Sequence, residues 1–506
     1  MPNGFEITSM SMEVNDDFKA AFSDPRRQHF LGVIRYFTKY LVLLVRSFFP
    51  ILAGLAISDG LRQYAEVIGW GIFTLVVVAA IVEYWRFRFH VENRTIIIQK
   101  GLLEQETITI PFDRIQALHL EQAPWQRFVG LTGLKIDTAG TSGSEVDLQA
   151  LKIDEANVLR DGIMSAREES VTSSSENEPE SKLLVHLSLN ALLKVGVTQD
   201  HFRNGFLAFG AVIALYEPLK SWIDVWLSAV PEMVWSVLSW TWFLFIPLGV
   251  FLFLIVSFTI SIVGAFLKYF NLRAALHAQE ISLKAGLLRR FEYRIPLTKI
   301  QILEWKSNLL RRSLHIETLR IFQASAQESD ASGKGLAISV PGISQQASSK
   351  LVTAVFHDQT YDVKAEQIQP DSYLFYRLLI TRILSGSVLS FAFASGWGQL
   401  FMIGLVLLWA FWSSRKIFEN HWLRVTPDLC QLHSGWLRKK RTLFSFYQLQ
   451  RVVFYQNAVM RKRGVAHITF ATSAGNRTFK YLNETDASRL YDWSLAQIEQ
   501  SDLEWM

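Results

Sequence analysis

The stretch "KGLLEQETITIPFDRIQ", residues 100–116, decides the fold because the chain contains two further versions of it. "AGLLRRFEYRIPLTKIQ" occupies residues 285–301, and "SGWLRKKRTLFSFYQLQ" occupies residues 434–450. In each version a glycine is followed, fifteen residues later, by a glutamine. The glycines are Gly101, Gly286 and Gly435, and the glutamines are Gln116, Gln301 and Gln450.

The match continues beyond the glutamine without an insertion. Twenty-six residues after each glycine stands an arginine, namely Arg127, Arg312 and Arg461. The copies are offset by 185 and 149 residues, far more than the periods of about 20 to 50 residues that stacked repeats have. The sequence therefore predicts three copies of one domain rather than a solenoid.

The composition predicts that these domains accompany membrane segments. The chain has 506 residues, of which 50% are hydrophobic and only 19% charged, with 16 tryptophans and 36 phenylalanines. Such a chain is too apolar for an ordinary soluble protein. Its single cysteine, Cys430, excludes an internal disulfide framework and a cysteine-based zinc site. We expect Cys430 to be a small buried strand residue rather than a catalytic thiol.

Apolar runs precede each copy of the repeat. They occupy residues 41–57 and 67–82 before the first copy, 205–216 and 235–267 before the second, and 383–412 before the third. Because a helix needs about 20 residues to cross the hydrocarbon core, we expect six spans in three hairpins. A short turn around Asp59 and Gly60 joins the first pair in this prediction. The third run fits one overlong helix or a tight pair, and we choose the pair by analogy.

Basic residues predict the orientation of the spans. Lysines and arginines precede the first span and follow the even spans, whereas the hairpin turns carry only Arg62 and Lys220. By the positive-inside rule, the N terminus and all three repeated domains are expected to be cytoplasmic. Arg46 falls inside the first apolar run. We favour a side chain that reaches the inner headgroups over a buried functional charge.

Each copy has the pattern of antiparallel strands followed by a helix. Strand-like alternation with turn signals fills residues 87–122. Ala156, Leu159 and Ile163 then recur at helical spacing. Strands rolled into a small barrel, plugged by one C-terminal helix, are the plan of a pleckstrin-homology (PH) domain. The predicted fold is therefore a membrane α+β protein in which three transmembrane helical hairpins are each followed by a cytoplasmic PH-like antiparallel β-barrel with a C-terminal helix.

The expected order of segments along the chain is a cytoplasmic N-terminal segment (1–29), membrane hairpin 1 (30–83), PH-like domain 1 (84–166), a flexible linker (167–185), membrane hairpin 2 (186–268), PH-like domain 2 (269–366), membrane hairpin 3 (367–415) and PH-like domain 3 (416–500).

A membrane hairpin followed by "GLL…IP…RIQ…QRFVGLTGLKIDTAG" resembles the bacterial PH-domain (bPH2) membrane proteins, and the threefold arrangement is similar to the YdbT-like members of that group. The resemblance covers about residues 30 to 500. It implies a protein of the bacterial plasma membrane, without an established enzymatic activity, sometimes beside a smaller companion with a single PH domain. The copies depart from one another: "SNLLRRSLHIET" lacks the glycine of the first copy, and Ser445 replaces its proline.

Basic residues are the candidate binding groups. Arg127, Arg312 and Arg461 can pair with phosphate in a bidentate way, or can form stabilising ion pairs. The third copy adds two basic runs that we expect on adjacent turns, comprising Arg438, Lys439, Lys440, Arg441, Lys462 and Arg463. The repeated glutamines and glycines are expected to be structural. A net charge of only +5 beside a membrane favours anionic lipid over nucleic acid as partner.

The favoured function is a non-enzymatic scaffold in the envelope whose PH-like domains bind one another, a companion protein, a further copy or lipid headgroups. The alternative is an intramembrane enzyme or transporter component. "GTSG", residues 140–143, superficially matches a protease serine motif but falls in a hydrophilic turn, and no HExxH or P-loop motif is present. We therefore expect no catalytic residues, no metal and no cofactor.

Overall fold

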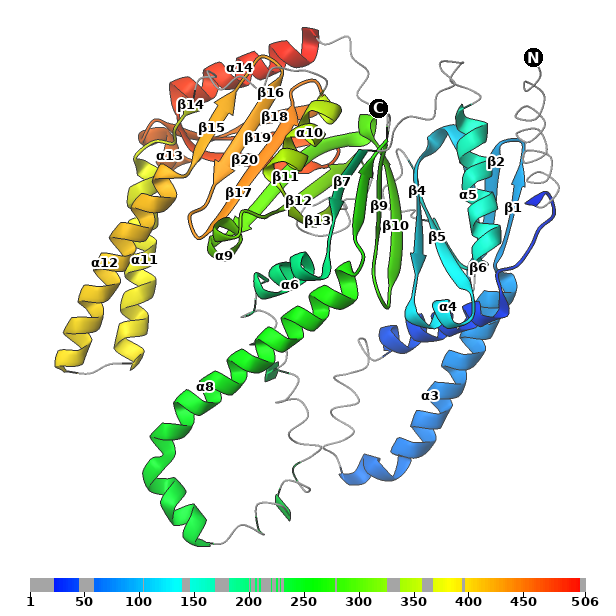
Figure 1. The fold of residues 1–506 in the computed structure, drawn as a ribbon, viewed down its shortest axis with the longest axis horizontal. Coiled ribbons are helices and arrows are strands. Elements are labelled where there is room, and N and C mark those ends of the chain that lie inside the picture. The colour runs from blue at the N-terminus through cyan, green and yellow to red at the C-terminus, as the bar shows by residue number, and fades with distance from the viewer. Residues whose placement is uncertain are drawn as a thin grey trace. The chain divides into compact units, whose positions relative to one another are not determined.

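The computed structural model describes residues 22–44, 59–102, 104–138, 146–168, 182–199, 232–277, 280–324, 337–356, 367–393 and 396–500, with a few shorter pieces between residues 201 and 228. Figure 1 labels the helices and strands of these residues. They belong to two compact units. Unit 1 contains the described residues up to 168 together with Arg289–Pro296, and unit 2 contains the other described residues.

Unit 1 contains the first repeat, whose strands alternate as its sequence predicts. Strands β1 (Arg88–Glu92), β2 (Thr95–Lys100) and β3 (Glu106–Pro111) form one antiparallel sheet. After η2 (Phe112–Arg114), a second antiparallel meander contains β4 (Ile115–Gln122), β5 (Leu131–Thr138) and β6 (Val146–Lys152). Their apolar faces share one core, in which Ile96, Ile98 and Leu134 are fully buried.

Helix α5 (Ile153–Glu168) closes this core. Ala156, Leu159 and Ile163 are 0% exposed within it, so the helical spacing identified the buried face correctly. In the third repeat, α14 (Glu484–Gln500) has the same role, and Ala487 and Leu490 belong to the core there.

Unit 2 contains the remaining strands. From the second repeat they are β8 (Arg273–Leu276), β9 (Glu280–Ala285), β11 (Ile300–Asn308), β12 (Glu317–Gln323) and β13 (Ala337–Ile343), with η3 (Leu297–Lys299) and α10 (Gln345–Phe356). From the third repeat they are β15 (Trp422–Val425), β16 (Leu429–Ser434), β17 (Arg438–Ser445), β18 (Leu449–Tyr455), β19 (Val465–Thr472) and β20 (Gly475–Asn483). Cys430 is fully buried in β16, as expected.

The repeats share sheets, which the sequence analysis did not foresee. In unit 2, β11 of the second repeat pairs with β17 of the third from Ile302↔Phe444 to Asn308↔Arg438. The result is one seven-stranded sheet, β13-β12-β11-β17-β16-β15-β14. In unit 1, β10 (Arg290–Pro296), which belongs to the second repeat by sequence, pairs with β4. Each junction satisfies backbone groups that an edge strand would leave unpaired.

The chain also returns to the sheet before each hairpin, which the sequence analysis missed. Strand β7 (Lys182–His186) pairs with β8, and β14 (Gln367–Ile368) pairs with β15. In the first repeat, Arg26 makes the equivalent bridge to Phe89. The expected flexible linker therefore ends in a strand, and its residues 169–181 lie outside the described part of the chain.

The segment expected to open the second hairpin (186–268) begins with a strand end and a short helix. Residues 189–197 form the amphipathic helix α6 (Leu189–Val197), capped by the Ser188 side chain and buried along Leu192, Val195 and Gly196. A Cβ on Gly196 would lie 3.1 Å from the Cα of Ile262, so α6 packs closely against helix α8 (Glu232–Tyr269). One face of α6 is therefore buried against α8.

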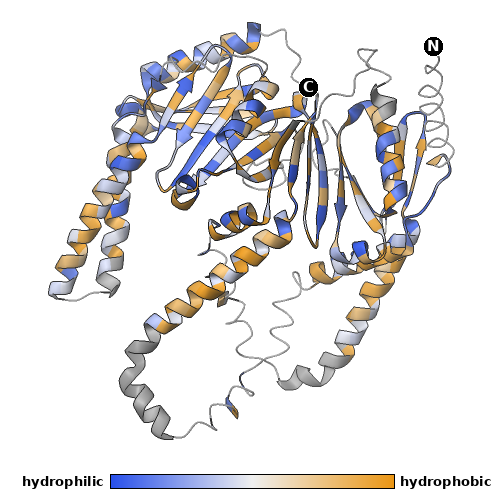
Figure 2. Ribbon diagram, viewed as in Figure 1, coloured by the Kyte–Doolittle hydropathy of each residue, from blue (hydrophilic) through white to orange (hydrophobic). Residues whose placement is uncertain are grey.

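Three helices among the described residues are long and apolar enough to cross a membrane: α3 (Asp59–Arg86), α8 and α12 (Trp397–Glu419). Figure 2 shows hydrophobic residues along them. Asp59 and Gly60 lie in the first turn of α3 rather than in a separate turn. The third apolar run forms two helices, α11 (Tyr373–Phe393) and α12, which pack where Gly386 meets Val406. Arg46 and most of the run 205–216 lie outside the described residues.

Candidate functional site

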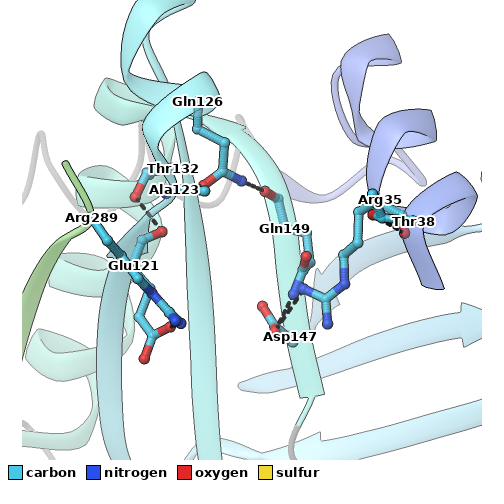
Figure 3. Close-up of polar contacts among 9 residues, drawn as sticks. All are labelled: Arg35, Thr38, Glu121, Ala123, Gln126, Thr132, Asp147, Gln149 and Arg289. Carbon is cyan, nitrogen blue, oxygen red and sulfur yellow. Dashed lines mark hydrogen bonds and ion pairs between the residues drawn. The ribbon is translucent and has the colours of Figure 1, made fainter. Parts of the chain in front are cut away.

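Each repeat places a short helix between its fourth and fifth strands. In the first repeat this is α4 (Pro124–Phe128), which Figure 3 shows with its polar anchors. Gln126 accepts a hydrogen bond from the Ala123 backbone N–H at 2.7 Å and donates to the Gln149 carbonyl of β6. The Gln126 side chain therefore ties the start of α4 to strand β6, while Phe128 at its other end remains 90% exposed.

The other two short helices occupy the same register. They are α9 (Leu309–Ser313) and α13 (Ala458–Lys462). Asn308 and Asn457 cap them by accepting hydrogen bonds from the backbone N–H groups of Arg311 and Met460, each at 2.8 Å. Exposed apolar side chains again accompany basic ones: Leu309 and Leu310 on α9, and Val459 on α13.

The three arginines that the repeat aligns have different surroundings. Arg127 and Arg461 are exposed, and Lys462 and Arg463 beside Arg461 are exposed as well. Arg312 is half-buried, and its Nη2 donates to the Trp436 carbonyl at 3.0 Å. Of these three arginines, Arg312 alone is therefore partly enclosed by neighbouring residues.

Helix α13 lies beside helices α11 and α12 of its own repeat. Its Met460 is buried in a cluster with Leu374 of α11, and Phe418 of α12 packs against the same cluster. The basic residues at the end of α13 are thereby held next to the ends of α11 and α12 that carry Tyr373 and Glu419.

The run "RKKR" at 438–441 lies in strand β17, so the expectation of two basic turns is wrong for this run. Successive strand residues point to opposite faces. Lys440 points toward Glu304, at 2.8 Å, and Lys439 and Arg441 line a pocket on the other face. The basic side chains of this run therefore lie in two different environments, one on each face of β17.

Glu304 has several cationic neighbours. Lys306 and Arg320 lie 3.2 Å from its carboxylate, and Arg477 of β20 lies 3.9 Å away. The Glu304 side chain is only 2% exposed. Burial alone would raise the pKa of Glu304, but Lys440, Lys306 and Arg477 outweigh burial and lower it to about 2. This cluster is a structural ion network that binds the second repeat to the third.

The repeated glycines occupy backbone conformations that disfavour side chains. Their φ angles are 125° at Gly101, 110° at Gly286 and 90° at Gly435. A Cβ at Gly101 would overlap the carbonyl of Glu104, and one at Gly435 would overlap that of Arg438. These glycines define the tight turn before the third strand of each repeat.

The repeated glutamines do not share one environment. Gln301 is fully buried and accepts a hydrogen bond from the Ala474 backbone N–H at 3.0 Å. Gln450 is exposed, and the Gln116 side chain is outside the described set. A common ligand role for them has no geometric support among the described residues.

Sequence reasoning missed the aromatic and basic residues that follow helix α12. Trp422 and Arg424 of β15 and His433 of β16 line the same pocket as Lys439 and Arg441. The alternation in "HWLRV" directly after the span was the available signal, because it places Trp422 and Arg424 on one face of a strand. No cluster of histidine, cysteine and carboxylate side chains suited to a metal occurs within the described residues.

Comparison with known proteins agrees with the repeated architecture. The sequence pattern of the bacterial PH domain family matches residues 40–167, 204–355 and 378–498. The UPF0699 transmembrane protein YdbT of Bacillus subtilis is 21% identical over 499 residues, which cover 93% of this chain and 98% of that protein. The UPF0699 transmembrane protein YdbS of the same organism is 32% identical over 96 residues, covering 19% of this chain and 58% of that protein. The chain therefore belongs to the bacterial PH domain family, as a transmembrane protein with three PH-like domains.

Proposed function

We propose that this protein is a non-enzymatic scaffold of the bacterial plasma membrane, which assembles copies of itself through the edges of its cytoplasmic PH-like domains. The pairing of strands between consecutive repeats carries this proposal. In unit 1 the junction β4·β10 is reinforced by Tyr293, whose hydroxyl donates to Glu121 at 2.8 Å, and by an ion pair between Arg289 and Glu121. The repeat thus builds a specific interface with its neighbour in the chain.

The first and last repeats each have one edge strand that corresponds to a strand paired at a junction between repeats. Strand β3 corresponds to β10 and β17, and strand β18 corresponds to β4 and β11. Among the described residues, the sheets β1-β2-β3 and β18-β19-β20 end at these strands. An exposed edge is a template for a further strand. The β18 edge of one copy therefore suits the β3 edge of the next copy.

Both internal junctions predict the same register for this contact. In the alignment of the repeats, Phe291 corresponds to Glu106, and Glu121 corresponds to Tyr455. The Phe291↔Glu121 pair of unit 1 therefore predicts that Glu106 lies opposite Tyr455. Lys440 and Lys306 occupy the same two repeat positions, so the Lys440↔Lys306 pair of unit 2 predicts the same contact. Glu106 and Tyr455 are both exposed, so neither contributes to the core of its own repeat. Such a head-to-tail contact makes rings or open filaments rather than a symmetric dimer.

Disulfide crosslinking in native membranes tests this contact. Two differently tagged full-length copies, one with Glu106→Cys and one with Tyr455→Cys, should form a disulfide under mild oxidation because directly opposed strand residues have suitable geometry. Cys430 is buried and should not contribute.

The matched control replaces Glu106→Cys by Thr107→Cys, which is also exposed but points to the other face of β3. Equal crosslinking in both pairs, or none in either, would remove the support for head-to-tail assembly. Crosslinking of Tyr455→Cys to a smaller PH-domain protein would instead identify that protein as the occupant of the β18 edge.

Contact with anionic headgroups is a second candidate function, favoured by the short helices. Helices α4 and α13 combine exposed apolar and exposed basic residues, the composition that binds membrane surfaces. Full-length protein with Val459→Cys, labelled with an environment-sensitive fluorophore, should show blue-shifted emission in phosphatidylglycerol nanodiscs relative to phosphatidylcholine nanodiscs. High salt should reverse the shift, and neutralising each of Arg461, Lys462 and Arg463 should weaken the contact by about 1 kcal/mol.

The same label on Arg489→Cys, an exposed position of α14, provides the control for lipid composition. Emission from position 459 that is identical in the two lipids would exclude a headgroup contact at α13.

A further inference from the structure

A pocket of about 420 Å³ lies on the face of the shared sheet opposite to Glu304. Its floor is a row of four side chains that cross-strand pairing places side by side. Trp305 of β11 is opposite Arg441 of β17, Arg441 is opposite His433 of β16, and His433 is opposite Trp422 of β15. Directly opposed residues share one face of a sheet, so the row combines both repeats.

Ring contacts hold this row in place. The Arg441 guanidinium lies 4.4 Å from the ring centroid of Trp305, and the Trp422 and His433 rings stack at 4.8 Å. The Trp305 indole N–H donates to Ser348 of α10 at 2.5 Å. The polar edges of the row are therefore ordered before any ligand arrives, which lowers the entropic cost of binding.

The pocket has an excess of positive charge. Arg312 of α9, Arg424 of β15 and Lys439 and Arg441 of β17 line it, with Glu317 as its carboxylate, 3.5 Å from Arg441. Burial, and then the positive charges of Lys439, Arg441 and Arg312, lower the pKa of His433. These arginines and lysine therefore create a positive potential that the single carboxylate does not cancel.

Two of the arginines that line the pocket each have a guanidinium N–H without a partner in the described part of the chain. The Nε atoms of Arg312 and Arg424 are buried and make no hydrogen bond among the described residues. A buried donor without an acceptor is energetically unfavourable. Both arginines line the pocket, so an oxyanion bound there would meet two guanidinium groups whose hydrogen-bonding capacity is not used up by the protein.

The pocket adjoins the end of membrane helix α12. Trp422 follows Glu419, the last residue of α12, by three positions, and the His433 ring contacts the Asn420 carbonyl at 2.7 Å. The Trp436 ring packs on Trp412 of α12 at 4.4 Å, and the Trp436 carbonyl accepts the hydrogen bond from Arg312. Tryptophans at a helix end are typical of the headgroup region. The pocket therefore lies close to the end of a helix that is long and apolar enough to cross a membrane.

We propose that this pocket binds a phosphate monoester and that an inner-leaflet lipid headgroup supplies it. A terminal phosphate offers the oxygens and the charge that Arg312, Arg424 and Lys439 lack, and the flanking tryptophans cover the glycerol portion. The source of the phosphate rests on the proposed cytoplasmic location of the domains, whereas phosphate binding itself does not.

The test uses the full chain in non-ionic detergent at low ionic strength. One arm titrates inorganic phosphate by calorimetry, and the other titrates short-chain phosphatidic acid in mixed micelles, with short-chain phosphatidylcholine as the uncharged reference. We expect phosphatidic acid to bind more tightly than inorganic phosphate. Arg424→Gln and Lys439→Gln should each weaken both interactions at least tenfold. Arg489→Gln, which removes the same charge from an exposed position on α14, should change neither.

Each outcome decides the proposal. Binding of both ligands that only the pocket variants weaken supports it. Binding of inorganic phosphate without binding of phosphatidic acid overturns the lipid source and indicates a soluble phosphate. Binding that Arg489→Gln weakens as much as Arg424→Gln, or no binding in either arm, overturns the site. Thermal denaturation of every variant shows whether a loss reflects unfolding instead.

Discussion

The two faces of strand β17 present the same kind of side chain in opposite circumstances. Lys440, on one face, shares the buried carboxylate of Glu304 with Lys306, Arg320 and Arg477. Lys439, on the other face, lies among Arg312, Arg424 and Arg441, with Glu317 as the pocket's carboxylate. Adjacent lysines in one strand thus serve a neutralised cluster and a positively charged pocket.

This difference separates a structural charge from a binding charge. A buried carboxylate that several cations surround holds two repeats together, because removing one partner leaves unpaired charge in the interior. A half-exposed cation among other cations does not stabilise the fold, since its neighbours repel it. Burial, followed by Arg312, lowers the pKa of Lys439, which means that the folded state disfavours its charge.

The largest effect is expected when the neutralised face loses its carboxylate. Glu304→Gln leaves Lys440, Lys306, Arg320 and Arg477 as a cluster of like charges at the junction of two repeats. We expect a loss of about 3 to 5 kcal/mol in the free energy of unfolding of unit 2. Thermal denaturation and limited proteolysis in detergent measure it. Glu317→Gln, a carboxylate beside Arg441 in the pocket, is the control and should lose less than about 1 kcal/mol.

Acid provides a second measurement of the same group. The pKa of Glu304 is lowered from 4.5 to about 2 in the folded state. Its contribution is therefore complete above about pH 4.5 and disappears as the pH falls toward 2. The wild type should lose more stability across this window than Glu304→Gln does. Parallel pH profiles for the two proteins would mean that Glu304 is not charged in the folded state.

Local patterns predicted the fold within each repeat but not the way in which repeats join. The spacing of Ala156, Leu159 and Ile163 identifies the buried face of α5 because helical periodicity is a property of a few consecutive residues. The choice of β17 as the partner of β11 depends on strands that are far apart in sequence. β14 contains only two residues, too few for any strand pattern.

The candidate site could be predicted in part for the same reason. The basic run 438–441 was identified, but whether it forms a turn or a strand decides which lysine meets Glu304 and which enters the pocket. Trp305 and Arg312 belong to the second repeat, and Trp422 and Arg424 follow a membrane helix. Only the shared sheet brings these residues together, so no single stretch of sequence contains the site.

Replacing the two adjacent lysines of β17, one at a time, separates the contributions of its two faces. Lys440→Gln removes one of the cations that neutralise Glu304, and we expect a loss of about 1 to 3 kcal/mol because a buried carboxylate keeps fewer partners. Lys439→Gln removes a cation that its neighbours repel, so stability should stay within about 0.5 kcal/mol of the wild type or rise slightly. The two variants have the same net charge and the same change of side chain, and differ only in the face of β17 that they alter. Thermal denaturation of both in one detergent measures the difference, and salt should reduce the loss in Lys440→Gln little because Glu304 is buried. Equal losses in the two variants would show that both lysines have structural roles, and the pocket would then lose its distinction from the ion cluster.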